Sequence, residues 1–438
     1  MRFILFLLIC SAMAQEVKAP DARLERARAR LQAIADRLQR YVCIETVNRS
    51  YYFPVLRNQQ FPAASEGLAS GRTELLTGVD WETRELEFTD RLRLEVSLSQ
   101  DRELHSWPGA TRFDVRDVDQ LIRDGPVSTG SFGAHLATTF GSSAVDFQYH
   151  GQARVGGREA LEYRYRVPGE ASKFGLRVAG TWIRLSYEGT IWVDPQTFDL
   201  YQLEVHPTDL PPSSEINRLA IAVDYESVRT ADGSVLLPHR SRLEILHQDG
   251  RATRNDITFN GCREYQAESE LVFDNEAPRT DTGAARVNLS PERLPLGLSV
   301  TVALESAIQT ETAAAGDPIS ARVVNPVRRP HSNEIVIPAG AMVRGRLRRV
   351  EHHVNPKSYF VIGMSFNRLE VDGSVAPFGA HYEGATDLAK SLGANLHPRA
   401  PGMAYWNVGT FLFATDKPNF ILPAGFRSDW FTLNTAGH

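Results

Sequence analysis

The hydrophobic pattern is most clearly helical near the beginning of the chain. Over residues 20–41, apolar side chains recur every three or four positions, which predicts one long amphipathic helix with a single buried stripe. Asp21 can cap its start. The arginines on its other faces are interpreted as a solvated surface, with a site for anionic lipid as the alternative. The stripe consists of Leu24, Ala27, Leu31, Ile34, Leu38 and Tyr41, and the arginines are Arg23, Arg26, Arg30, Arg37 and Arg40.

From residue 44 to about residue 273, the period of the pattern changes to two. Strict alternation gives a strand one solvent-exposed face and one apolar face, which predicts an antiparallel meander rather than a parallel sheet. Turn residues with positive φ separate the strands at Gly156-Gly157, Asp232-Gly233 and Asp249-Gly250. The clearest alternating segments are 91–98, 160–167, 218–225 and 242–246.

Residues 131–142 interrupt this pattern and predict a helix or loop with Phe132, Leu136 and Phe140 on one side. Residues 275–293 lose all periodicity and gather proline, glycine and polar residues, which indicates an interdomain linker. Short strands resume after it, at 298–304, 318–325, 334–337, 342–350 and 359–371.

A short motif occurs twice in this last part of the chain. Ile335-Val-Ile-Pro-Ala-Gly340 is repeated as Phe420-Ile-Leu-Pro-Ala-Gly425, and each copy predicts a strand that runs into a tight hairpin. The strands predict a small β-barrel or sandwich at 294–438. The predicted fold is therefore mostly β, with the long helix and the meander forming a curved antiparallel half-barrel at 15–274.

The first residues predict export. Arg2, an apolar run at 3–9 and Ala12-Met13-Ala14 have the order of a secretory signal peptide at 1–14, which is too short to span a membrane. Cys10 offers lipid attachment as an alternative, although Ile9 stands where such a site prefers a small residue. No later apolar stretch is long enough for a membrane span. We predict a periplasmic protein, with an outer-membrane-associated or extracellular location as alternatives.

Two cysteines follow the predicted signal, Cys43 and Cys262. An oxidising compartment favours a disulfide between them, and two buried free thiols are the alternative.

The sequence contains no motif that predicts catalysis. Gly-x-Ser-x-Gly is absent, and its nearest approach, Gly130-Ser131-Phe132-Gly133, is interpreted as a flexible loop. His352 and His353 follow Glu351, but adjacent strand residues point to opposite faces, so we expect surface histidines and no metal site. The net charge of -5 is too small to indicate a nucleic-acid partner. We predict a protein that is not an enzyme and has no cofactor.

Residues 187–204 form a predicted strand, an Asp-Pro turn and a returning strand. Together with the helix and meander, this segment resembles the lipoprotein-carrier (LolA/LolB-like) superfold over residues 20–274. The resemblance implies a curved sheet that wraps helices and leaves an apolar cavity for acyl chains. Residues 41–49 and 260–265 are similar to a set of uncharacterised exported bacterial proteins. No functional residue of the carrier matches a position of this chain.

The second domain resembles the C-terminal β-barrel of TrbI-like components of conjugation and type IV secretion channels. The matching order runs through Leu296, Gly316-Asp317, 321–327, the first copy of the repeated motif, 343–345 and 369–373. This resemblance implies a barrel that makes contacts in the cell envelope.

Aromatic side chains gather on neighbouring predicted strands of the meander. They either fill a core between helix and sheet or line a cavity for an apolar ligand. We predict a carrier or binder of a lipid or lipoprotein acyl chain, and an adaptor that binds an envelope protein partner is the alternative. An unrecognised hydrolase ranks third. The cavity candidates are Leu136, Phe140, Tyr163, Tyr165, Trp182, Tyr187 and Trp192.

Overall fold

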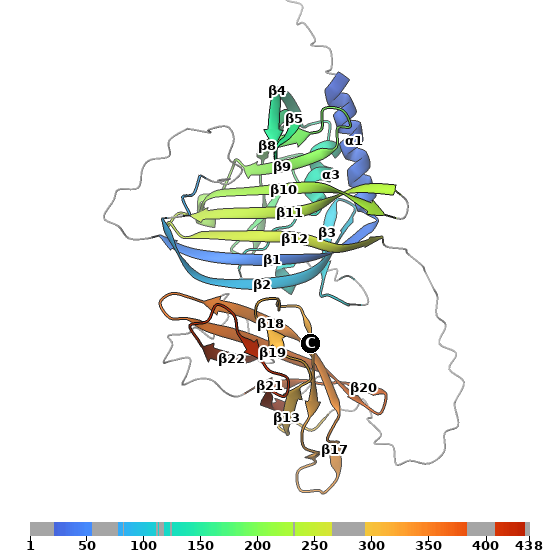
Figure 1. The fold of residues 1–438 in the computed structure, drawn as a ribbon, viewed down its shortest axis with the longest axis vertical. Helices are drawn as coiled ribbons and strands as arrows, with labels where there is room; N and C mark the ends of the chain where they lie inside the picture. Colours follow the sequence, from blue (N-terminus) through green and yellow to red (C-terminus); the bar gives the residue numbers. More distant parts are fainter. Residues whose placement is uncertain are drawn as a thin grey trace, which may run out of the picture.

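The two-residue alternation folds most of the chain into one continuous sheet. The structure is a computed structural model, and it describes residues 22–433 except 55–77, 82, 111–112, 114–117, 123–124, 231–232, 265–293 and 383–407. Within these residues, 18 strands belong to one sheet whose named strands all pair antiparallel (Figure 1). The predicted signal peptide, Cys10 and the predicted linker lie outside the described residues.

The N-terminal half contributes a broad, curved part of this sheet. Its strands follow the order β3-β2-β1-β12-β11-β10-β9-β8-β5-β4. The alternating segments of the sequence lie in β2, β5, β10 and β11, so the predicted antiparallel meander is confirmed. Their bounds are β1 Tyr41–Pro54, β2 Arg84–Ser99, β3 Arg102–Ser106, β4 Asp146–Val155, β5 Arg158–Val167, β8 Tyr187–Val193, β9 Leu200–Pro207, β10 Ile216–Thr230, β11 Gly233–His247 and β12 Ala252–Glu264.

Short elements complete this half. Helix α1 spans Ala22–Leu38 and ends earlier than predicted, because Tyr41 already begins strand β1. The segment predicted as helix or loop contains helix α3, Ala134–Gly141, and its three apolar side chains are buried as expected. The remaining elements are helix α2 Val118–Leu121, the 3-10 helix Pro212–Ser214 and a separate hairpin of β6 Gly175–Val178 and β7 Thr181–Arg184. No helix within the described ranges combines the length and apolar character that crossing a membrane requires.

The C-terminal half is a curled sheet that does not close. Its strands follow the order β22-β19-β18-β15-β13-β24-β21. Among the described residues, β21 and β22 at the two ends are not paired, so the predicted closed barrel is wrong. The bounds are β13 Ser299–Leu304, β14 Ile308–Gln309, β15 Pro318–Val323, β16 Val327–Arg328, β17 Ile335–Ile337, β18 Met342–His353, β19 Tyr359–Val371, β20 Ser374–Pro377, β21 Ala380–Tyr382, β22 Gly409–Ala414, β23 Ile421–Leu422 and β24 Arg427–Thr432.

Each copy of the repeated motif forms a tight turn, as predicted, but neither forms a hairpin. Gly340 and Gly425 have φ of 84° and 79°, values that favour glycine. The strand before each turn pairs with a short partner, β17 with β16 and β23 with β14. The strand after each turn, β18 or β24, returns to the main sheet instead. The motif therefore moves the chain from one strand pair to another.

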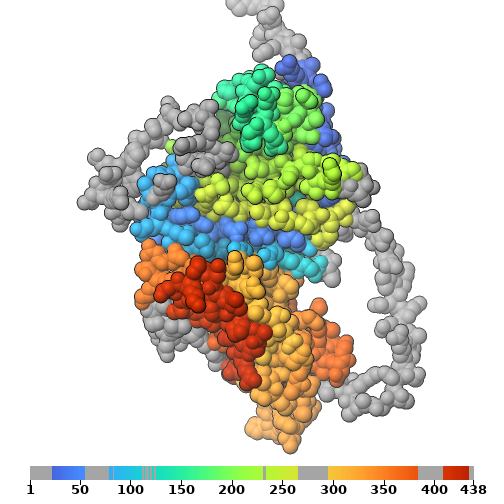
Figure 2. Space-filling model, in the orientation of Figure 1, coloured from blue at the N-terminus to red at the C-terminus, as the bar shows by residue number. Residues whose placement is uncertain are grey.

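Strand β2 joins the two halves because three different segments cover its outer edge. Thr89 pairs with His352 of β18, and Glu95 pairs with Ser106 of β3. Between these two pairings, the backbone of Ala315 exchanges hydrogen bonds of 2.8 Å with Arg91 and Arg93. In Figure 2, the C-terminal half accordingly packs directly against the blue strands of the N-terminal half.

Four aromatic rings stack across this junction on one face of the sheet. Tyr51, Phe88, His353 and Tyr359 come from β1, β2, β18 and β19, and successive ring centroids lie 4.0, 4.9 and 4.4 Å apart. On the opposite face, His352 stacks on Phe360 at 4.2 Å. The two histidines, predicted as surface residues, are partly buried because their rings stack on Phe360 and Tyr359.

A row of buried charges lies beside the four rings. Arg49 binds Asp90 through two hydrogen bonds of 2.7 and 2.8 Å, and Asp90 is the cross-strand neighbour of Glu351. Glu351 in turn accepts hydrogen bonds from Arg349 and His353. Burial alone would lower the pKa of Arg49, but Asp90 and other nearby groups raise it well above its ordinary value. Each buried arginine is therefore bound by a carboxylate of its own half, and the β2–β18 pairing places the two pairs side by side.

The predicted disulfide is confirmed. Cys43 and Cys262 are bonded with their Cα atoms 4.0 Å apart, and they join neighbouring strands β1 and β12 across a sequence separation of 219. Cys43 is fully buried in the core of the N-terminal half.

Replacing both cysteines by serine is expected to lower the free energy of unfolding by up to about 5 kcal/mol, because the unfolded chain regains the freedom of a long loop. Urea unfolding measured by circular dichroism checks this value. Reductant should shift the wild-type midpoint towards that of the variant and leave the variant unchanged. Equal midpoints for the oxidised wild type and the variant would contradict the prediction.

Asp90→Asn is expected to cost about 3–5 kcal/mol of stability, because Arg49 then remains buried without its carboxylate. Urea unfolding again measures the change. Glu370→Gln is the matched control, since it removes a carboxylate whose partner Arg344 is half exposed, and exposed pairs contribute only about 0–1 kcal/mol. Similar losses in the two variants would contradict the prediction that the buried Arg49–Asp90 pair is worth more than an exposed one.

Candidate functional site

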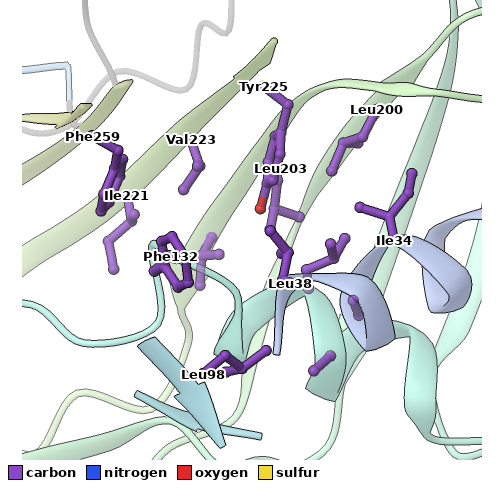
Figure 3. Close-up of a cluster of buried hydrophobic side chains, with 14 of the residues drawn as sticks. Ile34, Leu38, Leu98, Phe132, Leu200, Leu203, Ile221, Val223, Tyr225 and Phe259 are labelled. Atoms are coloured by element: carbon purple, nitrogen blue, oxygen red, sulfur yellow. The ribbon is translucent and has the colours of Figure 1, made fainter. Parts of the chain in front are cut away.

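The concave face of the N-terminal sheet and helices α1 and α3 enclose the candidate site. Figure 3 shows apolar side chains from both helices and from several strands meeting there. Five of the seven predicted cavity residues belong to this cluster, and each is less than 9% exposed. These five are Leu136, Phe140, Tyr163, Tyr165 and Tyr187.

The tyrosines in the cluster are fixed by specific contacts. Tyr165 packs edge-on against Tyr187 with ring centroids 6.1 Å apart, and its hydroxyl donates to the carbonyl of Glu204 at 2.5 Å. The Tyr187 hydroxyl lies 3.2 Å from Oγ1 of Thr139 on helix α3. The side chains that were predicted to line a cavity are therefore buried and packed against their neighbours.

The two tryptophans on the predicted list lie elsewhere. Trp182 is 50% exposed on β7, in the separate hairpin, and packs beside Gly175. Trp192 is on β8 with Tyr187, but the two lie an odd number of positions apart, so they face opposite sides of the strand. Its Nε1 donates to Glu162 at 3.3 Å. The structure therefore brings together five of the seven candidates, and their role in ligand binding remains a prediction.

Helix α1 covers the site and is bound to the rim of the sheet by arginines. Arg30 pairs with Asp199 at 2.7 Å, Arg28 donates to the Val145 carbonyl at 2.8 Å, and Arg37 donates to the Ser234 carbonyl at 3.0 Å. Arg30 is still about half exposed, so the predicted solvated face also makes surface contacts with the sheet. These side chains reach the sheet because the helix lies near the first residues of strands β4, β9 and β11.

Three ionisable side chains that were not predicted from the sequence are buried on the inner face, His105, Glu45 and Glu103. Nε2 of His105 lies 3.2 Å from the Glu45 carboxylate, and the Glu103 carboxylate accepts hydrogen bonds from backbone N–H groups at the start of helix α3, including those of Gly130 and Gly133. Burial raises the pKa of Glu103. Burial lowers the pKa of His105, but Glu45 outweighs it, so the net shift is upward. Glu45 at an inward position of β1, between Cys43 and Val47, was the available signal.

Two further polar atoms in the cluster have no partner within the described residues. Nε2 of His135 is buried, and its ring stacks against Phe174 at 5.4 Å. Burial lowers the pKa of His135 to about 4. The Tyr225 hydroxyl is also unpaired and points into the apolar cluster in Figure 3. Unpaired buried groups of this kind each cost about 1–3 kcal/mol.

The arrangement contains no recognisable catalytic pair. Ser131, in the loop considered for a hydrolase, is buried and its Oγ accepts a hydrogen bond from Ser241 at 2.9 Å. It therefore lies in a packed interior rather than in a flexible loop. Within the part of the chain that the structure describes, no group of three or more His, Cys, Asp or Glu side chains is placed to hold a metal ion.

Comparison with known proteins gives matches among solved structures only. No protein-family model and no curated protein matches the chain. A putative outer-membrane lipoprotein-sorting protein domain from Vibrio parahaemolyticus is 11% identical, with 57% of this chain and 96% of that chain covered and a TM-score of 0.27. A LolA superfamily protein from Nitrosomonas europaea is 10% identical, with 55% and 94% covered and a TM-score of 0.26.

The lipoprotein LppX from Mycobacterium tuberculosis is 10% identical, with 56% of this chain and 98% of that chain covered and a TM-score of 0.17. These similarities are weak, so function is inferred from the contacts of the chain itself. The TrbI-like resemblance of the C-terminal half stays a prediction.

The buried His135 should make stability depend on pH. Its folded-state pKa of about 4 lies below its ordinary value of 6.5, so the unfolded chain binds the proton first. The contribution of the neutral His135 to the free energy of unfolding is fully present above pH 6.5. Roughly 3 kcal/mol of it is lost as the pH falls to about 4.

His135→Phe keeps a stacking ring and removes the titration, so the stability of this variant is expected to fall less between those pH values. Urea unfolding across the pH range measures the difference. His239→Phe, at an exposed histidine, is the control and should follow the wild-type profile. Parallel profiles for wild type and His135→Phe would contradict the prediction.

Proposed function

We propose that this chain is an exported, non-catalytic protein of the cell envelope that carries an apolar ligand, a lipid or a lipoprotein acyl chain. The ligand would lie between the concave face of the N-terminal sheet and helices α1 and α3. The predicted signal peptide and the disulfide support export to an oxidising compartment, with the periplasm as the proposed location. The single observation that supports the site is an extended inner apolar surface whose cover, α1, is held at the rim by a few polar contacts.

Binding requires α1 to move, because the interior is filled when the helix is in place. The rim contacts are weak barriers, since the Arg30–Asp199 pair is partly exposed and such pairs contribute about 0–1 kcal/mol. The larger cost is the exposure of Leu31, Ile34 and Leu38, at roughly 1.5–3 kcal/mol for each side chain. Each buried acyl methylene returns about 0.8 kcal/mol, so a chain of roughly six to eleven methylenes offsets that cost.

We therefore expect a threshold in chain length. Monoacylglycerols with chains from about six to about eighteen carbons should bind measurably only above about ten carbons. Isothermal titration calorimetry with the full chain gives the affinities, and native mass spectrometry of protein from membrane extracts identifies a bound ligand. Ligand-free protein from every preparation, together with no binding of the longest chains, would overturn the proposed function.

A variant of the rim contact provides a sharper test. Asp199→Ala removes the partner of Arg30. This variant should exchange ligand faster and should bind monoacylglycerols with a shorter minimum chain length than the wild type. Glu370→Ala removes a comparable partner of Arg344 in the C-terminal half and should leave both unchanged. Equal effects of the two variants would show that α1 does not control access.

The filled interior also favours a second function, that of an adaptor in an envelope complex. Leu136, Tyr163 and Tyr187 are fully buried, as a purely structural core requires. An adaptor would yield a stable protein partner in a cross-linked pulldown and would bind no monoacylglycerol of any length.

A further inference from the structure

A half-open cavity lies at the junction of the two halves, away from the apolar interior. Its volume is about 260 Å³, and residues of β1, β2, β18 and β19 line it. Binding pockets for drug-sized ligands start at about 300 Å³, so this cavity suits a smaller molecule.

The pairing of the strands explains the floor of the cavity. Ser50, Thr89, His352 and Phe360 are successive cross-strand neighbours on β1, β2, β18 and β19. They alternate with the residues of the buried charge row and therefore face the opposite side of the sheet. The side chains of the charge row point to the other face, although Asp90 and Glu351 also contribute to the lining of the cavity.

One half of the floor presents hydrogen-bond donors without partners. Arg91 uses Nε to bind Oδ1 of Asn48 and Nη1 to bind backbone carbonyls of the C-terminal half. Its Nη2, the amide nitrogen of Asn48 and the hydroxyls of Ser50 and Thr89 make no hydrogen bond to any described residue. Since these groups are donors or can act as donors, they fit a ligand with several acceptors.

Arg91 brings a positive charge to the cavity, which the more distant carboxylates of Asp317 and Glu311 favour. The two carboxylates next to the cavity, Asp90 and Glu351, are bound by Arg49 and Arg349. Arg91 itself forms no salt bridge among the described residues, and four of the other lining residues are neutral and polar, namely Asn48, Ser50, Thr89 and Thr310. A guanidinium with free donors around it is suited to a carboxylate group.

The other half of the floor is apolar. Phe360 and Val350 are buried, and the His352 ring lies parallel to Phe360 at 4.2 Å. Burial lowers the pKa of His352, so this side carries no charge near neutral pH. A ligand that spans the floor therefore meets a cationic, donor-rich end and an aromatic end.

We propose that the cavity binds a small organic carboxylate, with the anionic group at Arg91 and the apolar part against Phe360 and Val350. This site is independent of the proposed acyl-chain site, because none of its lining residues belongs to the apolar cluster under α1.

Calorimetry with the full chain tests the proposal, with benzoate as the probe. Benzoate should bind at least about tenfold more tightly than neutral benzamide, and its affinity should fall as salt rises. Benzamide binding as well as benzoate, inorganic phosphate binding more tightly than benzoate, or no binding of benzoate would each overturn the proposal.

A double variant locates the binding event. Ser50→Ala with Thr89→Val removes two hydroxyls that bind no described residue and keeps the backbone pairing of Thr89 with His352, so the fold should persist. Its affinity for benzoate should fall at least about fivefold, whereas Thr190→Val on the outward side of β8 should match the wild type. Unchanged affinity in a folded double variant would place benzoate elsewhere and overturn the proposal.

Discussion

The pairing of strand β2 with β18 is the constraint on which the rest of the structure depends. An unpaired strand edge exposes a row of backbone donors and acceptors, and proteins must cover it. Here β18, the loop around Ala315 and β3 cover the outer edge of β2 in turn. Because backbone pairing fixes both distance and register, the two apolar cores are held in one orientation rather than joined by a flexible linker.

This register also explains why two different environments occur at one junction. In a strand, successive side chains point to opposite faces. The pairing that places Arg49, Asp90 and Glu351 on one face therefore places their chain neighbours on the other, namely Ser50, Thr89 and His352. If β2 shifted by one residue against its partner strands, the two sets of side chains would exchange faces, and Arg91 would be buried in place of Asp90. The compensated charges therefore specify the register that forms the cavity.

Local periodicity predicted much of the fold, since it determines which face of a strand is buried. The antiparallel meander, the disulfide and the apolar side of α3 followed from patterns within short segments. Pairing between distant segments did not follow. Nothing in the alternation around Thr89 indicates His352 as its neighbour, and so the histidines were expected at the surface. Trp182 and Trp192 were grouped with Tyr187 by proximity in sequence, although strand parity already separates Trp192 from Tyr187.

The same parity could have revealed the buried polar groups. Glu45, Arg49 and Asp90 interrupt apolar series at inward positions, and a charge at such a position requires a partner. The sequence can therefore indicate that an inner face is partly ionic, but only the sheet order identifies which charge meets which.

The position of the disulfide relative to α1 determines which part of the proposed carrier site can open. Cys43 lies just beyond the end of the helix and is bonded to β12, so the sheet and the C-terminal end of α1 are anchored together. The preceding turns of the helix are held by Arg28 and Arg30, whose partners lie at the rim. Regions with few buried contacts open at the lowest free energy. Access to the interior is therefore expected through a swing of α1 about its anchored end, with the sheet and the junction to the C-terminal half unchanged.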